Sequence, residues 1–238
     1  ATLCKHKDGL FYIHIQVKDE PPEPIKTTDV KGVDLGRTDL AISSDGEKFT
    51  GEGVKNKRDK LARVRASIQK KGTKSSKRLL KRLSRREKRY QSWVNHNISK
   101  QLVASAKVKG QSIALEDLTG IRDRTNSKPR NKTERRRSNS WAFHQLRQYI
   151  TYKALGAGVP VIFVNPAYSS QTCHKCLHIH PVKGKSYRSG KKYHCQHCGW
   201  QGDADFNGAQ NIKLLGACVT RPESTNLLSC SLLDRVSG

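Results

Sequence analysis

Two pairs of cysteines constrain this chain more than any other feature. Two residues separate Cys173 from Cys176, and two residues also separate Cys195 from Cys198. A gap of two lets a short turn direct both sulfurs of a pair at one ion, and four thiolates at about 2.3 Å complete the tetrahedral shell of Zn²⁺. We therefore expect these four cysteines to bind one structural zinc ion.

Two disulfides are the competing interpretation of the same cysteines. The chain has seven cysteines, an odd number, and no apolar leader precedes them to indicate export. Nearby histidines are alternative metal ligands, but four well-spaced thiolates already complete the shell. We expect the following side chains to be exposed or to support the site without binding the ion: His174, His178, His180, His194 and His197.

The charge of the chain indicates a polyanionic partner. Its 46 lysines and arginines outnumber 20 acids, which gives a formal net charge of +26. Such a surface repels itself unless it meets a polyanion, and nucleic acid is the natural candidate. A membrane is the alternative, but no apolar run approaches the roughly 20 residues of a span. We expect a nucleic-acid partner and no membrane.

Short hydrophobic segments between turn residues predict a sheet. Residues 30–36, 40–44 and 48–50 predict a three-stranded meander, and residues 113–116 and 161–164 predict two further strands. An earlier alternating segment, residues 10–18, predicts a half-buried strand that ends before a proline cluster.

Helical spacing of apolar residues appears in three places. Two strongly basic helices are predicted to meet near Gly72, and residues 55–89 contain Asp59 and Glu87 as their only acids. Ser140 is a candidate cap for a further helix, and a last helix is predicted to begin at Asp205. A second basic stretch, from Arg122 to Arg137, is typical of a phosphate-binding loop.

This order of elements predicts an α/β protein with the mixed sheet of the ribonuclease H-like (RuvC-like) fold, in which chain-distant carboxylates meet at one edge of the sheet. Asp34 in the first strand of this sheet, Glu116 at the end of the fourth and Asp205 at the start of the last helix are the candidates. Three carboxylates can hold two Mg²⁺ or Mn²⁺ ions, the arrangement used for two-metal cleavage of phosphodiesters.

Each acid also has a structural interpretation. Asp34 would then cap a turn, Glu116 and the adjacent Asp117 would be solvated acids at a strand end, and Asp205 would be a helix N-cap. Asp203 is an alternative to Asp205 in either role. Three acids at the expected places in an acid-poor chain favour the catalytic interpretation, with Asp205 rather than Asp203.

Five ordered motifs extend over residues 30 to about 216 and together resemble the TnpB family. They are Val33–Gly36, Leu115–Leu118, Trp141–Leu146, Pro166–Cys173 and Asp205–Asn211. These insertion-sequence proteins, long labelled accessory transposases, are related to type V CRISPR nucleases. The resemblance implies an RNA-guided endonuclease that cuts DNA at one RuvC-like site interrupted by a zinc ribbon. It places metal-binding acids at Asp34, Glu116 and Asp205 and zinc ligands at the four paired cysteines.

The resemblance also implies a domain organisation. Residues 1–24 would be a remnant of an N-terminal β-barrel, and residues 25–167 would form the nuclease core with a basic helical insertion at 55–110. Residues 168–203 would be the zinc ribbon, and 204–217 the last core helix. The tail, 218–238, has no interpretation. The chain has no methionine and begins in a strand-forming segment, so we expect a fragment that lacks its N-terminal part.

The expected function is Mg²⁺-dependent cleavage of DNA, fed as a single strand to the active site and guided by RNA from the transposon end. Base pairing with the guide would supply specificity, because lysine and arginine contacts to phosphate carry little sequence information. A cytoplasmic, nucleoid-associated location follows. The alternatives are a catalytically silent nucleic-acid-binding remnant and a DNA-joining transposase.

Overall fold

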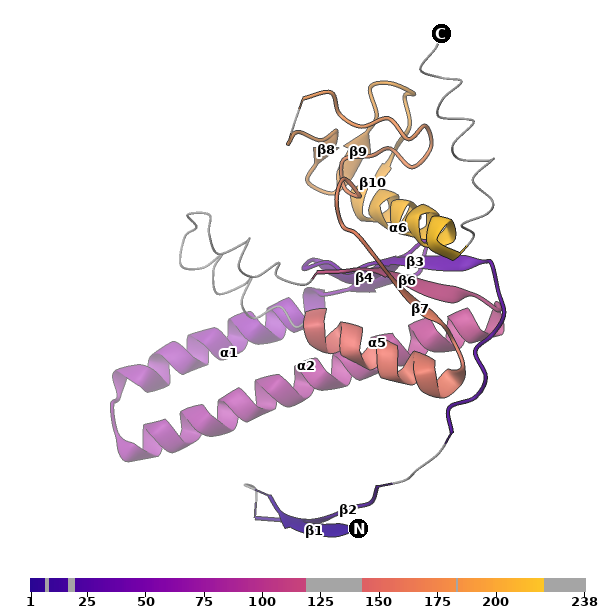
Figure 1. The fold of residues 1–238 in the computed structure, drawn as a ribbon. Helices are drawn as coiled ribbons and strands as arrows, with labels where there is room; N and C mark the ends of the chain where they lie inside the picture. The colour runs from indigo at the N-terminus through magenta and orange to yellow at the C-terminus, as the bar shows by residue number, and fades with distance from the viewer. Residues whose placement is uncertain (7–8, 17–19, 119–142, 183, 221–238) are drawn as a thin grey trace.

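The structure is a computed structural model that describes residues 1–6, 9–16, 20–118, 143–182 and 184–220. The predicted basic loop at 122–137, the candidate cap Ser140 and most of the C-terminal tail lie outside these residues. The described residues form a layered α/β core, a protruding helical pair, a small cysteine-containing ribbon and a separate β-hairpin (Figure 1).

A five-stranded sheet organises the core, in the order β5-β4-β3-β6-β7. Adjacent strands are antiparallel from β5 to β3 and parallel from β3 to β7. The predicted meander and the two later strands are confirmed within one or two residues. The strands are β3 (Val30–Asp34), β4 (Asp39–Ser43), β5 (Lys48–Thr50), β6 (Ser112–Glu116) and β7 (Val161–Val164).

Helices cover both faces of this sheet (Figure 1). Helices α2 (Lys74–Val108) and α5 (Phe143–Ala157) pack on one face, where Ile113 and Leu115 join the larger hydrophobic core. Helix α6 (Ala204–Thr220) packs on the other face, where Ala114 meets Ile212. Successive side chains of a strand point to opposite faces, so β6 serves both layers.

Helix α6 lies unusually close to β3 because glycine is present where the two meet. A Cβ atom on Gly32 would lie 2.1 Å from the carbonyl oxygen of Ala209 and 2.4 Å from the backbone nitrogen of Lys213. A Cβ on Gly216 would lie 2.9 Å from Cγ1 of Val30 in β3 and 2.7 Å from Cβ of Ala114 in the neighbouring β6. The helix backbone therefore rests almost directly on the strand, which only residues without side chains permit.

The two basic helices predicted to meet near Gly72 are confirmed as α1 (Glu52–Lys70) and the N-terminal part of α2, which together form a long hairpin (Figure 1). Thr73 caps α2 by accepting a hydrogen bond from the backbone nitrogen of Ser76 at 3.1 Å. Glu87 holds the helices together by pairing with Arg58 and Arg65. Among the helices of the described residues, none offers an apolar stretch that could traverse a bilayer.

A buried lysine connects β3 to α2 on the face opposite α6. Lys31 is fully buried, and its Nζ lies 2.9 Å from Oε2 of Glu47 and 2.7 Å from Oγ of Ser105 in α2. Asp45 adds a carboxylate oxygen at 3.3 Å. A buried charge needs such partners, so these contacts fix the strand, the β4–β5 hairpin and the helix relative to one another.

The predicted strand at 10–18 is shorter than expected and is not half-buried. Residues Phe11–His14 form β2, which pairs antiparallel with β1 (Thr2–Lys5), in the segment expected to form a strand at the start of the chain. Phe11 and Ile13 remain 63% and 67% exposed. The alternation correctly indicated a strand, but burial required a packing partner, and the described residues provide none for this apolar surface.

Replacement of Gly32 by alanine tests the close approach of α6. The new methyl group would meet backbone atoms that cannot rotate away, so we expect Gly32→Ala to lower the free energy of unfolding by about 3 kcal/mol. Gly156→Ala is the control, because it lies in α5 with open space around it and should stabilise by about 0.5–1 kcal/mol. Equal denaturation midpoints for the two variants would contradict this account of the packing.

Candidate active site and metal-binding ribbon

Two of the three predicted acids lie side by side because of the strand register. Val33 of β3 pairs in parallel with Leu115 of β6, so the next residues, Asp34 and Glu116, end neighbouring strands. Val33 and Leu115 face the α2–α5 core, and alternation places the two acids on the opposite face, beneath α6. The carboxyl ends of the strands thus present two carboxylates at one edge.

The third predicted acid, Asp205, comes from the first turn of α6 and is buried. Asp203, the alternative, does the capping instead: its Oδ1 accepts hydrogen bonds from the backbone nitrogens of Asp205 at 2.8 Å and Phe206 at 3.2 Å. The interpretation of Asp205 as the N-cap is therefore wrong. An acid two residues earlier satisfies the helix terminus, which leaves the Asp205 carboxylate available for other contacts.

A pocket of about 390 Å³ opens beside these acids. Asp34 and Glu116 form part of its wall, and Ala204 and Gly208 close it from the α6 side. A Cβ on Gly208 would lie 3.1 Å from Oδ2 of Asp34, so glycine leaves this carboxylate accessible. Further lining residues come from the loop after β7 and from the ribbon: Asn165, Pro166, Ala167, Ser169 and Arg188.

The three carboxylates interact electrostatically. Burial raises the pKa of Asp34 to about 8, with added contributions from the negative charges of Glu116 and Asp205, while Arg188 and Lys191 oppose the shift. Burial also raises the pKa of Glu116. Ionised acids at such a site are unfavourable unless positive charge balances them.

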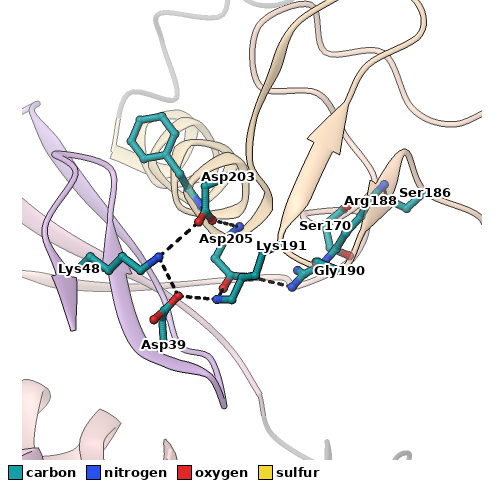
Figure 2. A network of polar contacts seen from close by, with 10 residues as sticks. Asp39, Lys48, Ser170, Ser186, Arg188, Gly190, Lys191, Asp203 and Asp205 are labelled. Atoms are coloured by element: carbon teal, nitrogen blue, oxygen red, sulfur yellow. Dashed lines mark hydrogen bonds and ion pairs between the residues drawn. The ribbon is translucent and has the colours of Figure 1, made fainter. Parts of the chain in front are cut away.

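Two cations from the ribbon supply part of that charge (Figure 2). Arg188 donates from Nη2 to Oδ1 of Asp205 at 2.8 Å, and Lys191 bonds the other oxygen of the same carboxylate. Lys191 also contacts Oδ2 of Asp39 at 2.5 Å. Burial disfavours the charged form of Lys191, but its bonds to the two aspartates raise its pKa overall.

The same network ties the meander to the ribbon. Lys48 of β5 lies 3.1 Å from Oδ2 of Asp39 and 3.5 Å from Oδ2 of Asp203 (Figure 2). Acids and lysines therefore alternate from Asp203 to Asp205. Neither Lys191 nor Asp39 could be assigned to the site from the sequence, because residues 39 and 191 are distant in sequence and no periodicity relates them.

The four paired cysteines converge at one point, as predicted. Their sulfur atoms all lie within 4.8 Å of one another. Across the two sequence pairs, the sulfur of Cys173 lies 3.7 Å from that of Cys198, and the sulfur of Cys176 lies 3.7 Å from that of Cys195. Thiolates around a tetrahedral Zn²⁺ at about 2.3 Å would lie about 3.8 Å apart. The donor set and its spacing therefore fit one zinc ion. None of the nearby histidines belongs to this group in the described part of the chain.

Each cysteine pair is closed by a tight backbone turn. The backbone nitrogen of Leu177 donates to the carbonyl of Cys173 at 2.7 Å, and that of Gly199 donates to Cys195 at 2.9 Å. Both residues have left-handed backbones, with φ of 58° at Leu177 and 73° at Gly199. Glycine adopts this conformation without strain, whereas leucine does so at a cost, so the first turn closes despite its residue type.

The ribbon is a small three-stranded sheet built around these turns. Tyr193 and Ala204 pack with two of the cysteines in a separate hydrophobic cluster, and Trp200 packs against it. The strands are β8 (Arg188–Ser189), β9 (Lys192–His194) and β10 (Gln201–Asp203). Because β10 leads directly into α6, the ribbon is continuous with the helix that carries Asp205.

Fold and site together define a ribonuclease H-like domain with an inserted four-cysteine ribbon, and comparisons with known proteins agree. Residues 143–212 match the Cas12f1-like TNB domain family. A solved Cas12f1–sgRNA–target DNA complex contains a chain of similar fold, with a TM-score of 0.62 and 17% identity over 86% of this chain and 52% of that one.

Several curated proteins are similar to this chain. A TnpB-like protein, MJ0751 of Methanocaldococcus jannaschii, is 38% identical over 52% of this chain and 45% of its own length. Cas12f1 of Sulfoacidibacillus thermotolerans is 28% identical over 90% of this chain. InsQ of Escherichia coli K12, a putative RNA-guided DNA endonuclease, is 30% identical over 89%. The resemblance to the TnpB family is therefore confirmed.

The chain spans about half the length of these relatives: 53% of the Cas12f1 protein, 45% of MJ0751 and 55% of InsQ. Activities that the relatives' names describe belong to longer proteins, so they apply to this chain only as proposals.

The raised pKa of Asp34, caused by burial and by the neighbouring acids, has a consequence for the stability of the fold. Asp34 ionises at about pH 8 in the folded chain but near 3.9 when unfolded, so its ionisation destabilises the fold increasingly as pH rises from 4 to 8. In divalent-free buffer at pH 8, we expect Asp34→Asn to raise the unfolding temperature by at least about 2–4 °C.

The effect of this substitution should shrink to near zero by pH 4, where the acid is protonated in the folded chain and only about half ionised in the unfolded one. Asp45→Asn is the matched control with the opposite sign, because Asp45 pairs with the buried Lys31 and its loss should lower the unfolding temperature. Thermal scans across pH would measure both. If the Asp34→Asn chain were less stable than wild type at pH 8, ionised Asp34 would not destabilise the folded chain as expected.

Proposed function

We propose that this chain carries the nuclease centre of an RNA-guided, Mg²⁺-dependent DNA endonuclease of a transposable element. The observation that carries the proposal is the meeting of Asp34 and Glu116 at adjacent strand ends, with Asp205 of α6 close enough to influence the charge of Asp34. These acids are distant in the chain but meet at one pocket, beneath a ribbon that supplies cations. Because clustered buried acids are unfavourable for folding, this arrangement favours a functional role over a purely structural one.

In this proposal Asp34, Glu116 and Asp205 hold two divalent ions, Mg²⁺ or Mn²⁺. Carboxylate oxygens suit these hard cations. The raised pKa of Asp34 indicates that its ionised form is unfavourable in the site, and a bound cation would stabilise that form. When bound, such a pair activates a water molecule and stabilises the leaving oxygen of a phosphodiester. The four cysteines hold one zinc ion with a structural role.

The remaining residues of the site position the substrate and balance charge. The guanidinium of Arg188 borders the pocket and is suited to a phosphate, which it can bind through two parallel hydrogen bonds. Gly208 keeps the approach to Asp34 open to a strand of DNA. Lys191 and Lys48 keep Asp39 and Asp203 neutralised, so that these neighbouring acids do not repel the phosphate.

Nucleic-acid binding is assigned to the basic surfaces. Helices α1 and α2 carry most of the lysines and arginines between residues 55 and 89, and these would bind the phosphates of the guide RNA and target DNA with strong salt dependence. Specificity would come from base pairing with a guide transcribed from the transposon end. A cytoplasmic, nucleoid-associated location is part of this proposal.

We assign these roles to separate parts of the chain. The nuclease core would comprise residues 25–167, with the helical insertion at 55–110. Residues 168–203 would form the zinc ribbon, and 204–217 would return to the core as its last helix. The separate clusters of buried side chains in the sheet core and in the ribbon support the division between the nuclease core and the ribbon.

Zinc binding is tested by metal analysis of the purified chain. We expect one zinc ion per chain, lost in Cys195→Ser because a buried ligand is removed. Cys218→Ser is the control and should retain full zinc, since Cys218 is exposed and lies outside the cysteine cluster. Equal zinc content in the two variants would refute the assignment.

Cleavage is tested on end-labelled single- and double-stranded DNA with protein purified together with its RNA. We expect cutting that requires Mg²⁺ and that falls by about 10³-fold or more in Asp34→Ala, the scale typical when one member of a catalytic set is removed. Glu52→Ala, an exposed acid at the start of α1, is the control and should cut normally.

The alternatives predict other outcomes of the same experiment. A folded, zinc-loaded sample that binds DNA but cuts nothing would identify a catalytically silent binding protein. Strand-transfer products joined to transposon ends would identify a DNA-joining transposase instead.

A further inference from the structure

Two asparagines of α6 fix the backbone of the loop that leads into the ribbon. Asn211 donates from Nδ2 to the carbonyl oxygens of Ser169 and Thr172, both at 2.8 Å. Asn207, one turn earlier, donates from Nδ2 to the Thr172 carbonyl at 2.8 Å. Both asparagines are buried, where an unsatisfied amide is costly, so these bonds strongly specify the path of the loop.

The same asparagines reach the first cysteine turn. The Oδ1 atom of Asn207 accepts a hydrogen bond from the backbone nitrogen of His174 at 3.0 Å. Asn207 therefore grips the chain on both sides of Cys173, at Thr172 and at His174. The zinc-binding end of the loop is thus docked on the helix that also carries Asp205.

At its other end the loop contacts a carboxylate of the candidate active site. The hydroxyl of Ser169 donates to Oε1 of Glu116 at 2.5 Å. The Pro166 carbonyl is a second possible acceptor for this hydroxyl at 3.1 Å, but a serine has one proton to donate, and the shorter contact is to the carboxylate. Ser169 is itself buried.

From this chain of contacts we infer that Ser169 is a positioning residue for Glu116, held in place by Asn211 and Asn207. The inference rests on the proposed function, because it treats Glu116 as a ligand of a divalent ion. Side chains that hydrogen-bond to metal ligands orient them, and their loss typically lowers metal affinity by about 10–100-fold. Through the shared loop, the ribbon and Glu116 are set in place by one helix.

Deletion of the Ser169 hydroxyl tests whether this residue positions Glu116 or is needed for folding. Ser169→Ala leaves both asparagine bonds intact, because Asn211 binds the backbone carbonyl of residue 169 rather than its side chain. Ser186→Ala is the matched control: its exposed hydroxyl bonds the carbonyl of Ser170 in the same loop at 2.9 Å but contacts no carboxylate among the described residues. Both variants should fold and keep their zinc. In divalent-free buffer, Ser169→Ala should lower the unfolding temperature by only about 2–4 °C, the effect of one lost buried hydrogen bond.

The first readout is the binding of Mn²⁺ alone to the zinc-loaded chain, followed by the loss of the electron paramagnetic resonance signal of the free ion. Divalent-free buffer replaces chelators, which would also strip the zinc. We expect Ser169→Ala to weaken Mn²⁺ binding by about 10–100-fold and Ser186→Ala to leave it unchanged. In cleavage, Ser169→Ala should need more Mg²⁺ for half-maximal rate while approaching the wild-type rate at saturation.

The outcomes distinguish this inference from the proposed function. If wild type and Asp34→Asn bind Mn²⁺ equally, the acids do not form a metal site and the proposed function fails. If wild type binds Mn²⁺ through Asp34, but Ser169→Ala binds it as tightly as Ser186→Ala, the metal site stands and the role of Ser169 is overturned. A Ser169→Ala chain that loses zinc or fails to fold would show a structural role for the hydroxyl and would also overturn the inference.

Discussion

The contact between α6 and β3 is the constraint on which the rest of the structure depends. A helix normally rests on a sheet through its side chains, but here Gly32 and Gly216 let the helix backbone approach the strand directly. This close packing brings the first turn of α6, with Asp205, beside the end of the strand that carries Asp34. Larger residues at these two positions would separate the acids even if every element formed.

The site that results is rich in negative charge within a strongly positive chain. Without added cations, Arg188 and Lys191 neutralise Asp205, while Asp34 and Glu116 border the pocket without an ion pair of their own in the described residues. The ribbon thus contributes to the site in two ways: its cysteines stabilise a small module that has little core, and its hairpin supplies compensating charge. Both contributions come from the one segment between Cys173 and Asp203.

Much of this arrangement could be predicted from sequence because it depends on local patterns. Alternation and turn residues located the sheet strands, the spacing of four cysteines predicted their convergence, and the order of elements predicted the mixed sheet. The network of Lys191 with Asp39 could not be predicted, since it joins side chains 152 positions apart. The roles of Asn207 and Asn211 were also missed, although their spacing of four residues on a predicted helix indicates a shared face.

The strand at residues 10–18 illustrates the opposite limit. Its alternation indicated the correct conformation, but alternation does not identify what covers the apolar side, and burial is a property of the partner as much as of the strand. The distinction between Asp203 and Asp205 depended on which carboxylate met the free backbone nitrogens of α6. That choice is made by atomic geometry at the helix terminus and has no signal in residue type.

The buried Lys31 gives the helical hairpin a mechanical connection to the sheet. Helix α2 has 35 residues, a length of about 52 Å, and most of its buried positions lie in its C-terminal half. The exposed half therefore projects from the core, while the buried half is bonded to β3 through the Ser105–Lys31 contact, three residues along the strand from Asp34. One continuous helix thus connects the basic hairpin to the strand that ends in the candidate active site.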